Sequence, residues 1–135
     1  MDAEIFTICL IKKFLSEGKN FFTYNSLRHF YYKNKIWRFF GRKYDWHTIE
    51  RTIRKLARMG VLIRRGTKKV IFELDEERAK KHVLYKLLER VNANIYHLPD
   101  GRIIFQYKGR EYCLYNREDI FRIVEDDISK LLNSR

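Results

Sequence analysis

The stretch that decides the fold is residues 45–73, which read DWHTIERTIRKLARMGVLIRRGTKKVIFE. Within it, apolar residues recur at helical spacing, namely Trp46, Ile49, Ile53, Leu56 and Ala57. This spacing predicts an amphipathic helix over residues 46–59 with one buried face. Asp45 is placed to cap the first turn of the helix, and Gly60 is a candidate left-handed residue at its end.

A β-hairpin is expected immediately after this helix. Two runs of high β propensity, residues 61–63 and 70–72, flank the sequence RRGTKK of residues 64–69, which is the pattern of two strands and a turn. Four cations lie in this turn: Arg64, Arg65, Lys68 and Lys69. Successive strand residues point to opposite faces, so we expect only one of Arg64 and Arg65 to contact DNA.

The outer face of the predicted helix is basic. The candidate contact residues on it are His47, Thr48, Arg51, Thr52, Arg54, Lys55 and Arg58. Arg51, Lys55 and Arg58 are spaced to form one stripe. A helix fits a major groove about 12 Å wide, where an arginine can bond to O6 and N7 of guanine. Solvated charged faces are common, but the basic hairpin beside this one favours contact with DNA.

These residues carry a resemblance to a known family. Residues 48–65, TIERTIRKLARMGVLIRR, resemble the recognition helix and first wing strand of winged helix-turn-helix proteins. That family commonly shows Thr or Ser, a hydrophobic residue and Arg at the helix start, and Gly with two hydrophobic residues entering the wing. The resemblance extends more weakly over residues 1–75. It implies three helices and a hairpin that usually bind duplex DNA in transcriptional regulators, although some members bind RNA or only protein.

The positive charge is concentrated in the first half of the chain. The 135 residues have a net charge of +12 and a pI near 9.8. Residues 1–75 hold 17 Lys or Arg and 7 Asp or Glu, a balance of +10, whereas residues 76–135 hold 12 and 10, a balance of +2. A generic solvated surface would spread this charge evenly. The imbalance therefore indicates that the first half has a polyanionic partner.

Other kinds of site find little support in the sequence. The four histidines have no partner at ligand spacing: His29, His47, His82 and His97. There is neither a glycine-rich phosphate loop nor a nucleophile motif, so we expect no metal, no cofactor and no catalysis. Cys9 and Cys113 form no paired motif, although a single bridge between them stays open.

We expect the protein to reside in the cytoplasm. The apolar run of residues 5–15 contains Lys12 and Lys13 and is too short to cross a bilayer, and the first residues do not resemble a signal peptide. The single Gln and the abundant Ile, Lys, Arg and Tyr resemble the usage of hyperthermophiles. A small basic chain of this kind resembles regulators of archaea or archaeal viruses, in which case the cytoplasm would be that of the host.

Residues 3–17 are expected to form the first helix. Its apolar arc is wider than a half-buried helix needs, so either the C-terminal part or a second subunit covers it. The width slightly favours a homodimer through this helix or through the C-terminal helices. Phe21 and Phe22 are expected to pair with the hairpin, and Thr23 to cap a second helix.

The segment KNKIWRFFGRKY of residues 33–44 is much longer than the tight turn usual before a recognition helix. Either the second helix continues through it to Gly41, or the segment is an inserted loop. Its candidate contact residues are Lys35, Arg38, Arg42 and Lys43, which alternate with aromatic residues. This alternation is typical of nucleic-acid binding by phosphate pairing and base stacking. The alternative is that the aromatic residues belong to the core.

Residues 76–135 are expected to form a helix, a β-meander and a second helix. Asp75 can cap a helix over residues 76–91, and turn sequences at 99–101 and 108–109 separate strands at 93–98, 102–107 and 111–115. Asn116 can cap the last helix, whose apolar residues are Ile120, Phe121, Val124, Ile128, Leu131 and Leu132. This extension is expected to pack on the first part or to dimerise.

The sequence thus predicts an α+β protein, with a winged helix-turn-helix domain over residues 1–75 and an extension over residues 76–135. The predicted function is sequence-specific binding of double-stranded DNA by a transcriptional regulator, with the helix in the major groove and the hairpin on phosphates. Two alternatives stay open. One is a protein-interaction or structural module that binds nucleic acid non-specifically. The other is an RNA or single-strand binder that stacks bases on Trp37, Phe39 and Phe40.

Overall fold

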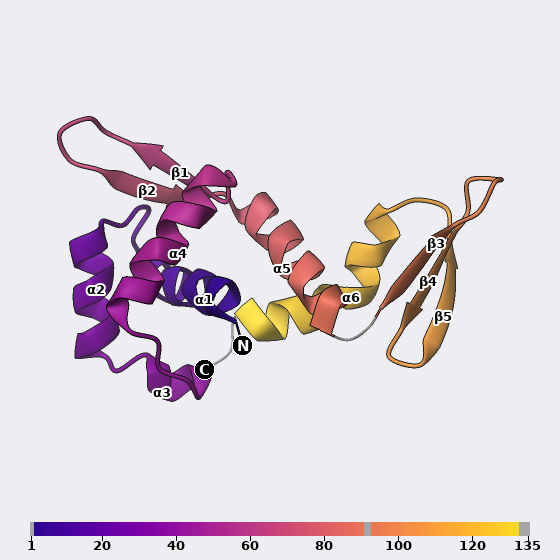
Figure 1. The fold of residues 1–135 in the computed structure, drawn as a ribbon, viewed down its shortest axis with the longest axis horizontal. Helices are drawn as coiled ribbons and strands as arrows, with labels where there is room; N and C mark the ends of the chain where they lie inside the picture. Colours follow the sequence, from indigo (N-terminus) through magenta and orange to yellow (C-terminus); the bar gives the residue numbers. More distant parts are fainter. Residues whose placement is uncertain (1, 91–92, 133–135) are drawn as a thin grey trace. The chain divides into compact units, whose positions relative to one another are not determined.

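The computed structural model describes residues 2–90 and 93–132 and shows an α+β protein (Figure 1). In chain order the elements are α1 (Ala3–Leu15), α2 (Tyr24–Lys33), α3 (Trp37–Phe40), α4 (Trp46–Arg58), β1 (Leu62–Arg65), β2 (Ile71–Leu74), α5 (Glu76–Arg90), β3 (Asn94–His97), β4 (Ile103–Tyr107), β5 (Arg110–Leu114) and α6 (Glu118–Leu132). The strands form a two-stranded sheet, β1-β2, and a three-stranded sheet, β3-β4-β5. The predicted α+β class is therefore confirmed.

The backbone divides into two compact units. Unit 1 holds the chain up to Lys80 together with the end of α6 from Leu131, and unit 2 holds Lys81–Lys130. The division falls inside α5, a few residues after the boundary that the sequence suggested. Since α1 to α4 and the first hairpin all belong to unit 1, every candidate DNA-contact residue lies in one compact body.

The helices of unit 1 begin where short polar side chains can accept hydrogen bonds from free backbone donors. Asp45 accepts from the N–H of Thr48 at 2.8 Å, and this bond holds the pKa of its carboxyl below the usual range. Thr23 and Ser26 form a capping box at the start of α2, with each side chain bonded to the other's backbone N–H. Both predicted caps are confirmed.

Helix α1 is the buried centre of unit 1. It packs on both α2 and α4, and seven of its consecutive residues are 0% exposed: Ile5, Phe6, Thr7, Ile8, Cys9, Leu10 and Ile11. A helix that is apolar over most of its circumference is expected in such a position. Packing inside the chain thus accounts for the wide apolar arc, and dimerisation stays a prediction.

The hairpin β1–β2 is attached to the helices by a third short segment. Phe22 and Phe72 exchange two backbone hydrogen bonds of 3.0 and 2.8 Å, and their rings stack with centres 5.4 Å apart. This confirms the predicted pairing of residues 21–22 with the hairpin. Gly66 lies in the hairpin turn at φ +88°, where a Cβ atom would come 2.1 Å from the carbonyl oxygen of Lys69. The turn therefore requires glycine at this position.

The segment of residues 33–44 is neither a continuation of α2 nor an irregular loop. Helix α2 ends at Lys33, Lys35 adopts φ +47°, and the short helix α3 then ends at Gly41 with φ +69°. The buried hydroxyl of Tyr31 donates to the carbonyl of Tyr44 at 2.7 Å and accepts from the N–H of Tyr44 at 3.2 Å. One α2 side chain thereby holds the end of the segment just before α4 begins.

Unit 2 contains the predicted β-meander covered by α6. Alternate residues of β4 are buried, namely Ile103, Phe105 and Tyr107, and Ile120 and Val124 of α6 are buried as well. The caps Asp75 and Asn116 accept the bonds predicted for them, from the N–H groups of Arg78 and Asp119. Val91 lies outside the described residues, as do the side chains of Ile128, Leu131 and Leu132.

Asp127 of α6 joins the helix to the sheet. It accepts hydrogen bonds from the ammonium group of Lys108, at 2.8 Å, and from the hydroxyl of Tyr107. These bonds hold the pKa of the Asp127 carboxyl below its usual range. Burial, and then the bond to Asp127, raises the pKa of Tyr107. Helix α6 is therefore fixed on the sheet by a charged group as well as by apolar packing.

We predict that Tyr31→Phe destabilises unit 1 by about 1–3 kcal/mol, because it removes a buried hydroxyl that bonds to two part-buried backbone groups of Tyr44. Urea unfolding followed by tryptophan fluorescence measures this effect, since both tryptophans, Trp37 and Trp46, lie in unit 1. Tyr32→Phe is the matched control, because the adjacent Tyr32 is partly exposed and its hydroxyl has no described hydrogen bond. Equal stability losses in the two variants would contradict the role given to the Tyr31 hydroxyl.

We also predict that Asp127→Asn destabilises unit 2 at neutral pH by about 1 kcal/mol, a value reduced by partial exposure of the pair. A carboxyl whose folded pKa is lowered stabilises the fold above its unfolded value of about 3.9 and loses that effect as pH falls through the folded value. The difference between the two proteins should therefore shrink below about pH 4. Hydrogen exchange of the β4 amides measures it. Asp126→Asn is the control: it removes the same charge from the adjacent, exposed residue and should leave the stability of unit 2 nearly unchanged.

Candidate nucleic-acid interface

The exposed face of α4 is lined by four basic side chains, which we call the α4 surface: His47, Arg51, Arg54 and Arg58. At about 100° per residue these four positions point in nearly the same direction, opposite the buried face of the helix. Arg51 and Arg58 have no carboxylate within 4.0 Å among the residues that the structure describes. Their guanidinium groups are therefore available to an external anion.

Two candidate residues of this helix lie away from the exposed face. The side chain of Thr52 is buried, and its hydroxyl donates to the carbonyl of Thr48 at 2.8 Å. Thr52 is buried because it lies next to Leu56 in helical projection, at the edge of the apolar face. A buried hydroxyl that is already bonded cannot contact a ligand, so Thr52 does not belong to the α4 surface. Thr48 is half-buried beside it.

The expected stripe of Arg51, Lys55 and Arg58 is also changed by the packing. The Lys55 ammonium lies 3.6 Å from the carboxylate of Glu4 on α1, so Lys55 marks the edge of α4 that adjoins α1. Arg54 takes the central position, although it pairs with Glu50 one turn earlier at 3.2 Å. The sequence could not separate Arg54 from Lys55, because only the position of α1 shows which edge of the helix is covered.

The hairpin adds positive charge beside the α4 surface. The charges of Arg54 and Arg64 both act on the hydroxyl of Tyr24, whose pKa is raised mainly by desolvation. Strand β1, which carries Arg64, packs against α4, and Arg64 is paired in register with the buried Phe72, so it lies on the same face of the hairpin as Phe72. Arg65 points to the other face and pairs with Glu73 at 3.0 Å, as expected from the alternation of strand residues. Lys68 and Lys69 are exposed at the turn, which projects beyond the helices (Figure 1).

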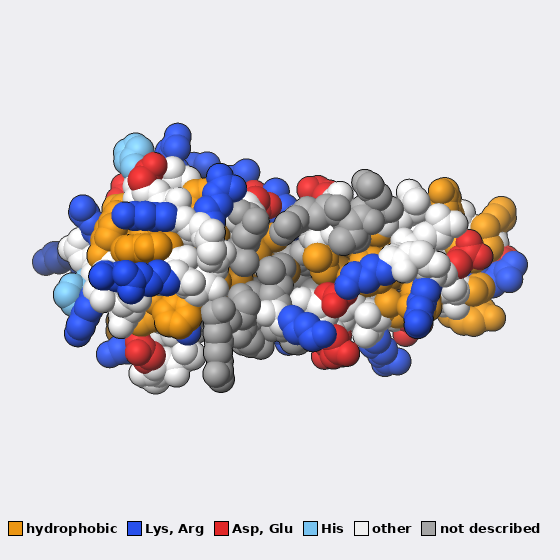
Figure 2. All heavy atoms as spheres, turned by 90° about the horizontal axis from the view of Figure 1, so that it is seen from below, with side chains coloured by type: hydrophobic (Ala, Val, Ile, Leu, Met, Phe, Trp, Pro, Cys, Tyr) orange, Lys and Arg blue, Asp and Glu red, His pale blue; other side chains and the backbone are white. Residues whose placement is uncertain are grey.

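A second basic surface surrounds α3. We define this α3 surface by six residues, in which cations lie over aromatic rings: Lys13, Trp37, Phe39, Arg42, Lys43 and Tyr44. Lys13 lies 4.3 Å from the centre of the Phe39 ring, Lys43 lies 4.5 Å from that of Trp37, and Arg42 lies 4.6 Å from that of Tyr44. On the left of Figure 2, blue Lys and Arg side chains alternate with orange hydrophobic ones.

The structure divides the aromatic residues of this segment between core and surface. Phe40 packs against the fully buried Phe6 with ring centres 5.4 Å apart, whereas Phe39 is 42% exposed. Lys35 and Arg38 are exposed as expected. Sequence reasoning missed Lys13, because this residue comes from the end of α1 and reaches Phe39 only through the packing of α1 beside α3.

The outer side of α2 carries a groove that sequence reasoning also missed. We call it the α2 groove, and it has a volume of about 520 Å³ with five lining residues: Asn25, Arg28, His29, Tyr32 and Lys33. These positions follow the spacing i, i+3, i+4, i+7 and i+8, so they share one face of the helix. That spacing is the signal that could have revealed the groove from the sequence.

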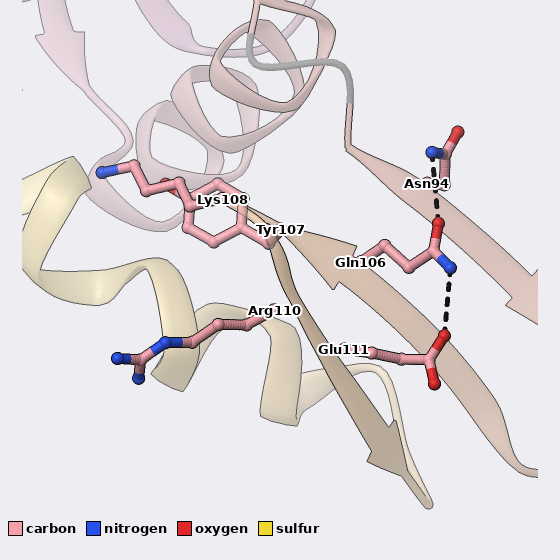
Figure 3. Close-up of a pocket in the computed structure, with 7 residues that line it drawn as sticks. Asn94, Gln106, Tyr107, Lys108, Arg110 and Glu111 are labelled. Atoms are coloured by element: carbon pink, nitrogen blue, oxygen red, sulfur yellow. Dashed lines mark hydrogen bonds between the residues drawn. The ribbon is translucent and has the colours of Figure 1, made fainter.

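Unit 2 has a hollow of about 380 Å³ at the turn between β4 and β5, drawn in Figure 3. Its polar groups are largely bonded to one another. Asn94 donates to Gln106 at 3.4 Å, Gln106 donates to Glu111 at 3.0 Å, and Lys108 is paired with Asp127. The mixed charge and internal bonding give this hollow no preference for a polyanion.

Other chemistry has no arranged site within residues 2–90 and 93–132. No group of three or more His, Cys, Asp or Glu side chains there could hold a metal ion. Cys9 and Cys113 are not joined by a disulfide, and burial raises the pKa of the Cys9 thiol to about 12, which keeps it protonated. No helix of the described chain has both the length and the apolar character needed to cross a membrane.

Comparison with models of known protein families, with curated proteins and with solved structures gave no match. The likeness of residues 48–65 to a winged helix-turn-helix segment is therefore a likeness of a short motif. The function has to be inferred from the charge, exposure and arrangement of the chain's own residues.

Proposed function

We propose that unit 1 is a winged helix-turn-helix domain that binds double-stranded DNA, and that the protein acts as a non-catalytic transcriptional regulator. The sequence resemblance implies three packed helices followed by a hairpin, and α1, α2, α4 and β1–β2 agree with that order, with the short α3 as an addition. The single observation that carries the proposal is the α4 surface, whose cations continue into Arg64 and the hairpin turn. Arg51 and Arg58 have no described carboxylate partner, so their charge is directed outward.

In the proposed complex, α4 enters the major groove. A helix with its side chains is about 10–12 Å across and fits a groove about 12 Å wide. Arg51 and Arg58 would reach base edges, where a paired bond to guanine supplies sequence preference. Arg64, Lys68 and Lys69 would contact phosphates, which supplies affinity without sequence preference.

The segment before α4 differs from the tight turn that usually precedes the recognition helix of winged helix-turn-helix proteins. Instead of a tight turn, residues 34–45 contain α3 and end at Asp45, which caps α4. Arg42 and Lys43 are therefore held within a few residues of the start of α4. In the proposed complex they would contact phosphates that flank the groove occupied by α4.

Unit 2 has a different proposed role. Residues 76–135 are close to neutral, with a balance of +2, so they offer little attraction to DNA. We propose that this part of the chain supports a homodimer. A symmetric dimer would bind two half-sites about 34–36 Å apart, one turn of the double helix.

A second candidate function is non-specific binding of a polyanion, either nucleic acid or an acidic protein. Arg54 and Lys55 favour this alternative, because each is already paired with a carboxylate of unit 1. Cations that are already paired are less free to make the paired bonds to base edges on which sequence preference depends. The two functions differ in whether replacing cations of α4 alters sequence preference.

We predict that Arg51→Ala with Arg58→Ala weakens binding to a preferred duplex by about 2–6 kcal/mol and relaxes sequence preference, because base contacts are lost. The preferred duplex is recovered by repeated selection from a random pool, and fluorescence anisotropy measures affinity. Lys55→Ala is the control on the same helix, since Lys55 lies at the α1 edge. A double variant that weakens all duplexes equally would contradict base reading by α4.

We predict a different result for Lys68→Ala with Lys69→Ala. All duplexes should weaken alike, and the slope of log affinity against log salt should become shallower by about 1.8, because two phosphate contacts are lost. Titrations between 100 and 300 mM salt give this slope. Arg122→Ala is the control, since Arg122 is an exposed cation of unit 2. An unchanged slope would show that the hairpin turn does not contact phosphates.

A further inference from the structure

The chain contains a long stretch without acidic residues. Residues 18–44 hold seven Lys or Arg residues and no Asp or Glu, and they include ten of the chain's 21 Phe, Tyr and Trp residues. In the structure this stretch forms both the α2 groove and most of the α3 surface. Neither surface uses a residue of the α4 surface or of the hairpin turn.

The α2 groove and the α3 surface are joined by aromatic contacts. The Tyr32 ring lines the groove, and its centre lies 6.0 Å from that of Trp37, over which Lys43 is held. Tyr31 packs edge-on against both rings, with centres 5.1 Å from Tyr32 and 5.2 Å from Trp37. Since Tyr31 is fully buried, it supports the exposed ring of Tyr32 from the core side.

The groove places an exposed ring between cations. Tyr32 is 38% exposed, and Arg28 and Lys33 lie on either side of it along α2. Neither cation has a carboxylate within 4.0 Å in the part of the chain that the structure describes. All five residues that line the groove are exposed, so the groove is open along α2. A planar group can therefore lie against Tyr32 while an anion is bound beside it.

We propose that the α2 groove, with the adjoining α3 surface, is a second nucleic-acid site that binds a single strand. One base would stack on Tyr32, and Arg28, Lys33 and Lys43 would bind the phosphates on either side of it. Bases stacked inside a duplex cannot reach a ring on the protein surface, whereas the bases of a single strand can. The exposed ring thus favours a single strand over a duplex. The absence of Asp and Glu from residues 18–44 favours a ligand with several negative charges.

The cations over aromatic rings assist this site. A lysine held over a ring has already lost part of its rotational freedom, so less entropy is lost when it binds a phosphate. Lys43 over Trp37 and Lys13 over Phe39 are held in this way. Lys43 is shared with the proposed duplex contacts, whereas Tyr32, Arg28 and Lys33 are not, so variants of Tyr32 test this site separately from duplex binding by α4.

The test uses the full chain and two fluorescently labelled single strands of 15 nucleotides, one of thymidine and one of uridine. A DNA duplex of 15 base pairs is measured for comparison. Anisotropy at 100 mM salt should show binding of a single strand, and the two oligomers distinguish DNA from RNA as the source of the strand. Tyr32→Leu should reduce single-strand affinity about tenfold, the loss expected for one stacked base, and change duplex affinity less than twofold. Tyr32→Phe keeps the ring and should retain binding.

Two controls separate stacking from other effects. Tyr85→Leu replaces a tyrosine that is 61% exposed in unit 2 and should leave single-strand binding unchanged. Tryptophan-detected unfolding should show that Tyr32→Leu stays folded under the binding conditions. The proposal is overturned if neither oligomer binds, if Tyr32→Leu binds single strands as well as the unaltered chain, or if it loses single-strand and duplex affinity equally. Loss of duplex binding in the α4 variants alone would leave this site unaffected.

Discussion

The packing of the Phe6 ring is the interaction on which the rest of unit 1 depends. This fully buried ring on α1 contacts Tyr31 of α2, Phe40 of α3 and Tyr44, with ring centres 6.0, 5.4 and 4.9 Å apart. Helix α1 is thereby joined at one point to α2, to α3 and to the residue before the cap of α4. The start of α4 follows directly after Tyr44, so the orientation of the α4 surface depends on a ring that contacts no ligand.

The cations of unit 1 fall into two groups with different roles. Lys55 and Arg54 are paired with the carboxylates of Glu4 and Glu50 and help to hold α4 in place, although exposed pairs of this kind contribute about 0–1 kcal/mol each. Arg51 and Arg58 on α4, and Arg28 and Lys33 on α2, have no such partner among the described residues. The proposed functions rest on this second group, because unpaired charge can be neutralised only from outside.

Local signals in the sequence were sufficient for most of the secondary structure. The caps at Thr23, Asp45, Asp75 and Asn116 depend on bonds within three residues, and helical spacing or strand alternation depends on near neighbours. Such features can be recognised without tertiary information. The break at Lys35 and the short helix α3 could not, since a run rich in Phe, Trp, Lys and Arg suits a longer helix as well as a loop.

The sequence by itself determined the α+β elements, the basic character of residues 1–75 and the apolar face of α4. Only the tertiary structure decided which polar residues are accessible. Thr52 is buried, Lys55 rather than Arg54 lies against α1, and Lys13 reaches the ring of Phe39 from another helix. The physical reason is that periodicity shows which side of a helix is apolar, whereas the edges of that side are set by the neighbours that cover them.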